Sequence, residues 1–361
     1  MKKTFLSELL VAERSQLSGN KLELNSGIYP VYGANGLVTY INFYEVDKPY
    51  LAVIKDGAGV GRVYKCPSKS SVLSTLQYLL PNSKIDLNYA YYWLSSLCLS
   101  KYAHGAAIPH IYYKDYKYES LLLPSLMVQK KIAERLDKVQ KLIAKQKGQI
   151  ATLDLLIKSR FLDMFGDPIT NPKGWIVRQI GQVSKIVSGT TPSTQNPIYW
   201  QGNLPWLTPA EIPDNMNYIN NTQRKISLKA VRDCSLRLLP RGTVILSSRA
   251  PIGKVAIAGV PLYCNQGFKN LILDDKQMNA VFVCSLLRQR VTEIISLGRG
   301  ATFKEISKDI VSHISIYVPP LFLQNQFANF VKSVEQQKEV FSARLSYLEV
   351  LYKSLMQEYF G

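Results

Sequence analysis

Two stretches of the chain decide its fold, because they repeat each other. They read PSLMVQKKIAERLDKVQKLIAKQKGQIATLDLLIKSRFLDMFG at 124–166 and PPLFLQNQFANFVKSVEQQKEVFSARLSYLEVLYKSLMQEYFG at 319–361. The chain therefore holds two copies of one unit, each a variable body followed by a similar tail. At an offset of 195 residues the tails align without a gap, and 11 of the 43 pairs are identical, among them Pro124/Pro319, Gln129/Gln324 and Phe165/Phe360.

Each tail carries the pattern of a coiled-coil helix. Seam residues recur at alternating steps of four and three, as the a and d positions of a heptad do. A proline precedes each tail and a glycine ends it, which suits the start and the stop of a helix. The apolar seam residues are Ile132, Leu136, Val139, Ile143, Ile150, Leu153 and Ile157 in the first tail and Phe327, Val331, Val334, Phe341, Leu345, Leu348 and Tyr352 in the second.

The common register of the two seams predicts that the helices pack on each other. The alternative is that each amphipathic helix packs on its own body. An approximate twofold axis would make the helices antiparallel, with one body at each end of a rod roughly 60 Å long at about 1.5 Å per residue. Met1 would then lie near Gly361.

The repeat divides the chain into two bodies, at 1–123 and 167–318, and two helices, at 124–166 and 319–361. Buried strands are predicted at 50–54 and 242–246, each before a glycine-bearing turn, and short helices around 89–99 and 278–296. The predicted fold class is α+β, with two mixed α/β domains joined by two long helices that form an antiparallel coiled coil.

The charge of the chain points to an anionic partner. With a formal net charge of +18 and 47% hydrophobic residues, the 361 residues suit a folded core with a positive exterior. The excess is +4 over 1–123, +5 over 124–166, +9 over 167–318 and 0 over 319–361. A polyphosphate that contacts both bodies and one helix would account for this distribution, and a solvated basic face is the plainer alternative.

Several other classes of protein are disfavoured. No stretch approaches 18 uninterrupted apolar residues, so no membrane association is expected. Five widely spaced cysteines indicate reduced thiols in a cytoplasmic protein, and three histidines argue against a metal site. The glycine-rich run Gly57–Gly61 precedes another predicted strand, which favours a hairpin turn over a phosphate-binding loop. Together these patterns favour a binding protein over an enzyme.

Candidate DNA-reading residues are polar or basic side chains, most of them on glycine-flanked turns. Arg and Lys can reach guanine acceptors, Asn and Gln can pair with adenine edges, and any of these side chains can bind phosphate instead. For each single residue, ordinary turn chemistry is the alternative. The candidates are Lys55, Arg62, Ser70, Gln77, His110, Tyr112 and Lys114 in the first body and Ser248, Arg249, Lys254, Asn265, Gln266, Lys269, Arg299, Thr302 and Lys304 in the second.

Several motifs along the chain form a specific set. They are the two helix starts, LPSLMVQ at 123–129 and PPLFLQ at 319–324, with their heptads, and YPVYGANG at 29–36, LSSRAPIG at 246–253 and NQGF at 265–268. In these motifs the chain resembles the specificity subunits of type I restriction-modification systems, and the resemblance covers nearly the whole chain. One departure is that the first body lacks an equivalent of Gly174-Trp175-Ile176-Val177 ahead of Leu6.

The resemblance implies a noncatalytic subunit that reads a bipartite double-stranded DNA target, one half-site per body, with the helices as a ruler. It implies two modification subunits, which bind S-adenosylmethionine and methylate adenine, and restriction subunits that use ATP and Mg to translocate and cut. No cofactor is expected on this chain. The alternatives are a specificity chain for a fused methyltransferase-nuclease, a single-chain DNA-modifying enzyme, and a coiled-coil adaptor without DNA preference.

Overall fold

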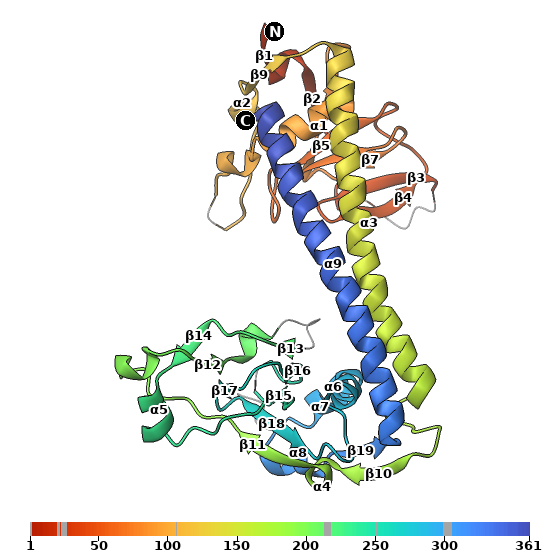
Figure 1. The fold of residues 1–361 in the computed structure, drawn as a ribbon. Helices are drawn as coiled ribbons and strands as arrows, with labels where there is room; N and C mark the ends of the chain where they lie inside the picture. The colour runs from red at the N-terminus through yellow and green to blue at the C-terminus, as the bar shows by residue number, and fades with distance from the viewer. Residues whose placement is uncertain are drawn as a thin grey trace. The chain divides into compact units, whose positions relative to one another are not determined.

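The computed structural model describes residues 2–19, 22, 27–105, 107–212, 218–249, 251–298 and 305–361. The chain divides into two compact units, a first of Met1–Lys147 with Ala343–Gly361 and a second of Gly148–Ser342. The two long helices, α3 (Leu126–Phe165) and α9 (Leu321–Phe360), each contribute to both units (Figure 1). The division falls inside the helices, so the domain boundaries drawn from the repeat stay a prediction.

The body of the first unit contains three small sheets, ordered β2-β8-β5-β6, β4-β3-β7 and β1-β9. Its short helices are α1 (Leu87–Ser96) and α2 (Tyr113–Tyr116). Its strands are β1 Lys2–Phe5, β2 Leu10–Arg14, β3 Tyr29–Gly33, β4 Gly36–Ile41, β5 Tyr50–Ile54, β6 Val63–Cys66, β7 Ser71–Val72, β8 Leu76–Pro81 and β9 Ser120–Leu123.

The body of the second unit contains sheets ordered β11-β18-β15-β16-β13, β14-β12-β17 and β10-β19. Its strands are β10 Ile176–Gln179, β11 Ser184–Ser188, β12 Leu204–Leu207, β13 Tyr218–Ile219, β14 Arg224–Ile226, β15 Val244–Ser247, β16 Val255–Ala258, β17 Tyr263–Cys264, β18 Phe268–Leu273 and β19 Ser315–Val318. Its helices are α4 Ile180–Val183, α5 Leu228–Asp233, α6 Ala280–Gln289, α7 Val291–Ser296 and α8 Lys308–His313.

The two bodies share one topology. Strands β2, β8, β5 and β6 have the same order and antiparallel pairing as β11, β18, β15 and β16. In each three-stranded sheet the central strand has one antiparallel and one parallel neighbour. The bodies therefore repeat each other in structure, as the tails do in sequence, although the sequences of the bodies differ.

The central strand of each large sheet is buried on both faces, because its successive residues are apolar and point to opposite faces of the sheet. Leu51 and Val53 of β5 pack in the core that contains α1, while Ala52 packs in the core beside the three-stranded sheet. In β15, Leu246 and Ile245 divide between two cores in the same way. Strands buried on both faces lack the polar alternation of a half-exposed strand, and both were predicted close to their observed positions.

The structure refines two sequence-based expectations. The helix expected around 278–296 is two helices, because the chain turns at Arg290, whose side chain is buried against Glu293 and the carbonyl of Ser315. The first body lacks a sequence counterpart of Gly174-Trp175-Ile176-Val177, but it has a strand at the corresponding place. β1 pairs antiparallel with β9 as β10 pairs with β19, so Lys2–Phe5 stands where Ile176–Gln179 stands in the second body.

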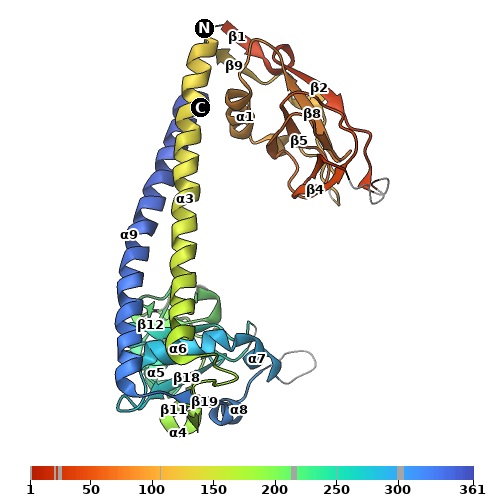
Figure 2. The same cartoon turned by 90° about the vertical axis from the view of Figure 1, so that its right-hand side faces the viewer.

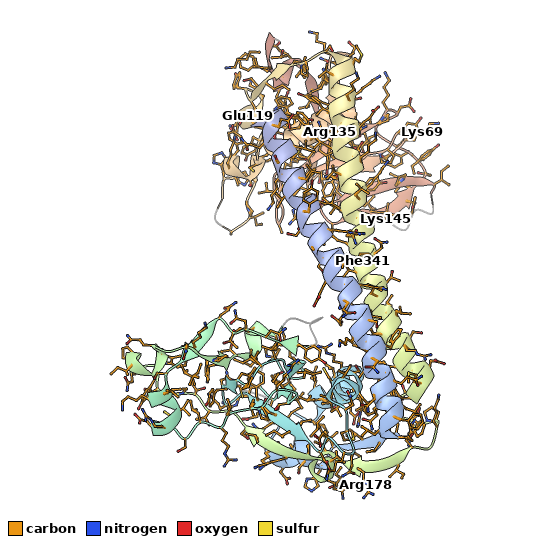
Figure 3. All side chains as sticks on the ribbon, in the orientation of Figure 1. Lys69, Glu119, Arg135, Lys145, Arg178 and Phe341 are labelled. Carbon is orange, nitrogen blue, oxygen red and sulfur yellow. The ribbon has the colours of Figure 1, made fainter. Side chains whose placement is uncertain are left out.

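In each unit α3 packs antiparallel against α9. Figure 2 shows the ribbons of both helices, and Figure 3 labels Arg135 on α3. In the first unit the side chain of Arg135 donates to the hydroxyl of Tyr359 at 2.9 Å, and that of Gln140 donates to the hydroxyl of Tyr352 at 3.0 Å. In the second unit Lys338 pairs with Asp154. All fourteen apolar seam residues given above are buried or half-buried. The predicted fold class is confirmed.

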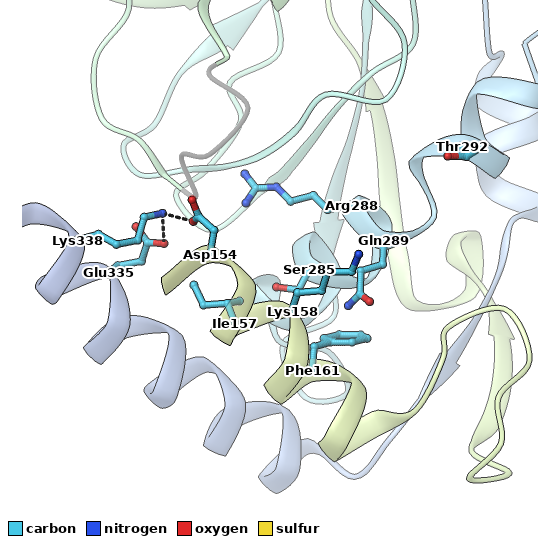
Figure 4. Close-up of a pocket in the computed structure, with 10 residues that line it drawn as sticks. All are labelled: Asp154, Ile157, Lys158, Phe161, Ser285, Arg288, Gln289, Thr292, Glu335 and Lys338. Carbon is cyan, nitrogen blue, oxygen red and sulfur yellow. Dashed lines mark hydrogen bonds and ion pairs between the residues drawn. The ribbon is translucent and has the colours of Figure 1, made fainter. Parts of the chain in front are cut away.

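The helix pair of the second unit contains one buried cation. The Lys338 ammonium lies 2.7 Å from a carboxylate oxygen of Asp154 and 3.1 Å from one of Glu335 (Figure 4). It borders a hollow of about 400 Å³ that is also lined by Arg288 and Phe161. Lys338 thus stands at a seam position of α9, where the other seam residues given above are apolar, and its charge is paired by these two carboxylates.

All five cysteines are free thiols in the structure. Among the described residues no helix has the length and hydropathy needed to cross a membrane. Within the same residues no three His, Cys, Asp or Glu side chains are grouped so that they could hold a metal ion.

Candidate nucleic-acid interface

Several predicted residues of the first body line one hollow of about 620 Å³. Four cationic side chains face it, and only one acidic side chain does. The lining includes Arg14, Lys55, Asp56, Gln77, Tyr112, Tyr113, Lys114 and Lys117. Positive charge concentrated in a concave surface of this size suits the phosphates and base edges of a nucleic acid.

Strand pairing brings these residues together from distant parts of the sequence. Arg14, at the end of β2, lies opposite Gln77 of β8, and Lys55 directly follows the central strand β5. The amide of Ile111 donates to the carbonyl of Lys55 at 2.9 Å, which places Tyr112 beside the ends of the strands. We call the place where β2, β5 and β8 meet the chain before α2 the corner; in the first body it contains Arg14, Lys55, Gln77 and Tyr112.

The corner of the first body has a net positive charge. Asp56 pairs with Lys55 at 3.2 Å, whereas among the described residues no carboxylate lies within ion-pair distance of Arg14, Lys114 or Lys117. The Lys114 ammonium lies 5.1 Å from the ring centroid of Tyr112. These cations are therefore available to an anionic partner.

The floor of the corner is polar and hydrogen-bonded. Gln77 is buried, and the hydroxyl of Tyr116 donates to its side-chain oxygen at 3.3 Å. Burial raises the pKa of Tyr116 well above the usual value of a phenol, so this hydroxyl keeps its proton. Gln77 thus has little exposed surface, and its side-chain oxygen accepts a hydrogen bond from within the fold.

The corner of the second body occupies the same place in the shared fold. Lys269 of β18 lies opposite Ser188 of β11, as Gln77 lies opposite Arg14. The amide of Ile306 donates to the carbonyl of Ser248 at 2.9 Å, which matches the bond between Ile111 and Lys55. Candidates chosen separately in the two bodies therefore converge on one structural position.

Charge is arranged differently in the second corner. The buried Lys269 ammonium lies 3.2 Å from the hydroxyl of Ser248 and 3.2 Å from a carboxylate oxygen of Glu305, whose other oxygen lies 2.9 Å from Arg249 Nε. Burial by itself raises the pKa of Glu305, but the bonds from Arg249 and Lys269 bring that pKa below its usual value. Ser248 and Lys269 are held inside the fold, and Arg249 is exposed.

Comparisons with known proteins identify the family. A family model described as "Type I restriction modification DNA specificity domain" matches residues 1–155 and 172–349. The chain belongs to this family. Its two matches, one over each half, agree with the internal repeat.

Curated members of the type I DNA specificity family resemble the chain over parts of their length. The type I restriction enzyme MjaIX specificity subunit of Methanocaldococcus jannaschii is 34% identical over 191 residues, 52% of this chain and 44% of that protein. The MjaVIII specificity subunit of the same organism is 23% identical over 346 residues, 86% of this chain and 78% of that protein. The chain spans less than two thirds of the length of several of these relatives, 32% for the HindI specificity subunit of Haemophilus influenzae.

Solved structures of the family share the fold. The S subunit of a type I restriction-modification system from M. genitalium aligns with a TM-score of 0.66 at 16% identity, over 100% of this chain and 96% of that one. A chain from a structure titled for complex assembly and conformational transition of the type I R-M system aligns with a TM-score of 0.58 at 16% identity, over 99% and 97%.

The remaining predicted residues of the first body lie outside the corner or at its edge. Arg62 is exposed on the turn between β5 and β6. The hydroxyl of the buried Ser70 lies 2.7 Å from the carbonyl oxygen of Pro67 and 2.9 Å from the hydroxyl of Tyr50, so this side chain is committed to the fold. His110 is half-buried with its ring 5.0 Å from that of Tyr112.

In the second body the remaining candidates differ in exposure. Lys254 donates to the carbonyl of Ile212 at 2.8 Å, and the side chain of Asn265 accepts from the amide of Gly267 at 2.9 Å, so both help to hold loops. Gln266 is exposed and contacts the hydroxyl of Thr191. Arg299, Thr302 and Lys304 lie outside the described residues.

Sequence reasoning missed cations that this member of the type I DNA specificity family brings to its surface. Arg14 and Lys117 reach the corner only through strand pairing and the fold of the chain around α2, so no local pattern marks them. In the second body the Arg224 guanidinium lies 3.8 Å from the ring centroid of Trp200 and 5.2 Å from that of Trp206. Only a cluster of tryptophans at 200 and 206 could have drawn attention to it.

Proposed function

We propose that the chain is a DNA-reading specificity subunit of a type I restriction-modification system, with each body reading one half of a bipartite target. The cationic corner of the first body is the observation that carries this proposal. Arg14, Lys114 and Lys117 lack a carboxylate partner among the described residues and suit phosphates, and we assign base contacts to Lys55 and Tyr112, which line the same hollow.

The shared topology of the bodies supports the bipartite part of the proposal. Two bodies with one fold and unlike corners would perform one task on two different sequences. Among the described residues, Arg249 and Gln266 are the exposed candidates of the second body. The names of the curated relatives support the same reading, since they are specificity subunits of type I restriction enzymes.

In this proposal the chain does no chemistry and binds no cofactor. Two modification subunits bring S-adenosylmethionine, and restriction subunits bring ATP and Mg. Apolar side chains of the long helices outside the seam support such partners. In the first unit Leu142, Tyr347 and Val350 are exposed, and in the second Leu155 and Val340 are. Exposed apolar surface on a helix commonly marks a protein contact.

Selection from a random DNA library by the full-length chain, alone and with its modification subunits, tests the proposal. We expect two enriched sequence blocks separated by a gap of fixed length. The logarithm of the affinity for the enriched DNA should fall linearly with the logarithm of salt concentration, because counterions are released. Equal recovery of all sequences at moderate salt would favour a structural adaptor, and methylation by the chain alone would favour an enzyme.

A further inference from the structure

A buried glutamine near the start of each long helix makes the same three hydrogen bonds in both units. In the first unit Gln129 is fully buried. Its amide nitrogen donates to the carbonyls of Pro124 at 2.9 Å and Lys84 at 3.0 Å, and its side-chain oxygen accepts from the amide of Asp86 at 2.8 Å. Every hydrogen of the side-chain amide is therefore used.

The second unit repeats this arrangement. Gln324 is also fully buried. Its nitrogen donates to the carbonyls of Pro319 at 2.8 Å and Gln277 at 3.0 Å, and its oxygen accepts from the amide of Asn279 at 2.9 Å. The identity of Gln129 and Gln324 in the repeat thus corresponds to an identical set of contacts.

Each glutamine binds the start of a helix that belongs to the body. Asp86 caps α1 by accepting from the amide of Tyr89 at 3.0 Å, and Asn279 caps α6 by accepting from that of Val281 at 2.8 Å. Two of the three bonds go to the body, so the glutamine does more than cap its own helix. All of its partners are main-chain groups, and one junction can therefore serve two bodies with different side chains.

The second part of each junction comes from the far end of the other long helix. In the first unit the ring of Tyr89 on α1 lies 5.2 Å from that of Phe360, at the end of α9. In the second unit the ring of Phe282 on α6 lies 4.8 Å from that of Phe165, at the end of α3. The identity of Phe165 and Phe360 in the repeat is explained by this contact.

We propose that Gln129 with Phe360, and Gln324 with Phe165, are positioning residues that set the orientation of the first and the second body on the helix pair. Each pair would thereby control the reading of one half-site only. This inference rests on the proposed function. Its most distinctive consequence concerns Phe165. This residue ends the helix that follows the first body in sequence, but it would control the reading of the half-site that the second body binds.

The test uses the full-length chain and the random DNA library described above. Gln129→Met keeps the length of the side chain and removes all three hydrogen bonds, and Phe360→Leu removes the ring at the same junction. Gln324→Met and Phe165→Leu do the same in the second unit. The control is Gln326→Met, the same substitution at an exposed position of α9.

A mismatched base pair normally lowers affinity by about five- to 150-fold. We expect Gln129→Met and Phe360→Leu to reduce this discrimination several-fold in one half-site, and Gln324→Met and Phe165→Leu to reduce it in the other. The unaffected half-site, the affinity for random DNA and the result with Gln326→Met should stay at their wild-type values. The unaffected half-site is the readout that general destabilisation would not preserve.

Equal loss in both half-sites, no loss in either, or Phe165→Leu affecting the same half-site as Gln129→Met would overturn the inference. If a glutamine variant does not fold, as judged by thermal unfolding, the phenylalanine variant at the same junction decides the outcome. If the wild-type chain enriches no bipartite sequence, the proposed function fails instead, so the two failures can be told apart.

Discussion

Lys114 is the single residue that best probes the corner of the first body. It is exposed, it lies beside Tyr112, and among the described residues no carboxylate neutralises it. Its charge can therefore act on DNA without first breaking an ion pair. The second corner differs, because there the carboxylate of Glu305 pairs with two cations, Arg249 and Lys269, and holds them in place.

We predict that Lys114→Glu weakens DNA binding for all sequences and lowers the slope of log affinity against log salt by about one. The physical reason is the loss of one phosphate contact and its counterion. Fluorescence anisotropy over a salt series measures this. Lys48→Glu, the same change at an exposed site of the first body outside the hollow, should leave the slope nearer to the wild-type value. An unchanged slope with Lys114→Glu would place the DNA elsewhere.

We predict that Glu305→Gln destabilises the second unit by about 1–3 kcal/mol, because the buried Lys269 loses its carboxylate partner. The pKa of Glu305 is lowered in the folded chain, so its stabilising effect is present above the unfolded pKa and is lost as pH falls through the folded pKa. Urea unfolding at pH 7 and at pH 3 should therefore show a smaller difference between variant and wild type at pH 3. An equal difference at both pH values would contradict this role.

At the scale of elements, two side-chain contacts identify the register in which α3 and α9 pair. Lys338 lies opposite Asp154, and Tyr352, fourteen residues further along α9, lies opposite Gln140, fourteen residues earlier in α3. Fourteen residues are two heptads, so both units use one register. A slip of one heptad would bring Lys338 opposite Lys147 or Phe161, neither of which can neutralise it.

We predict that Asp154→Leu costs about 1–3 kcal/mol of unfolding free energy, because the buried ammonium keeps only its remaining partners. Lys338→Met, which replaces the cation by an apolar side chain of similar length, should change stability by less than about 1 kcal/mol. Chemical unfolding of the two variants and of the double variant checks the coupling. Equal losses in both single variants would show that the ion pair itself stabilises the helices, and would contradict this prediction.

The helices could be predicted from the sequence because their pattern is local. Heptad spacing, the leading proline and the terminal glycine lie within one segment, and the observed helices fall inside the predicted ranges. The common topology of the bodies could not be predicted, because it depends on pairing between distant strands such as β2 and β8. Lys55 was found because it is a basic residue beside a glycine-bearing turn, whereas Arg14 was missed because only the pairing of β2 with β8 brings it to the corner.

For the whole molecule, the proposed ruler depends on matched helix lengths. We predict that removing Lys141–Lys147 from α3 together with Leu345–Leu351 from α9 shortens the gap in the DNA target. These segments face one another in the observed register, and the deletion preserves that register on both sides. Seven residues span about 10 Å of helix, which corresponds to about three base pairs of DNA. Selection from the random library reports the gap directly, and an unchanged gap would end the ruler hypothesis.

The division of the chain also has a consequence for its synthesis. The second unit, Gly148–Ser342, is one continuous stretch, whereas the first unit needs Ala343–Gly361. Those last nineteen residues supply Leu355, Tyr352 and Phe360 to its core. On the ribosome the half that is made first is therefore completed last. Until Ala343–Gly361 have been made, the first body exposes the apolar surface that α9 will cover, and this interval is when a chaperone or an aggregating neighbour would meet it.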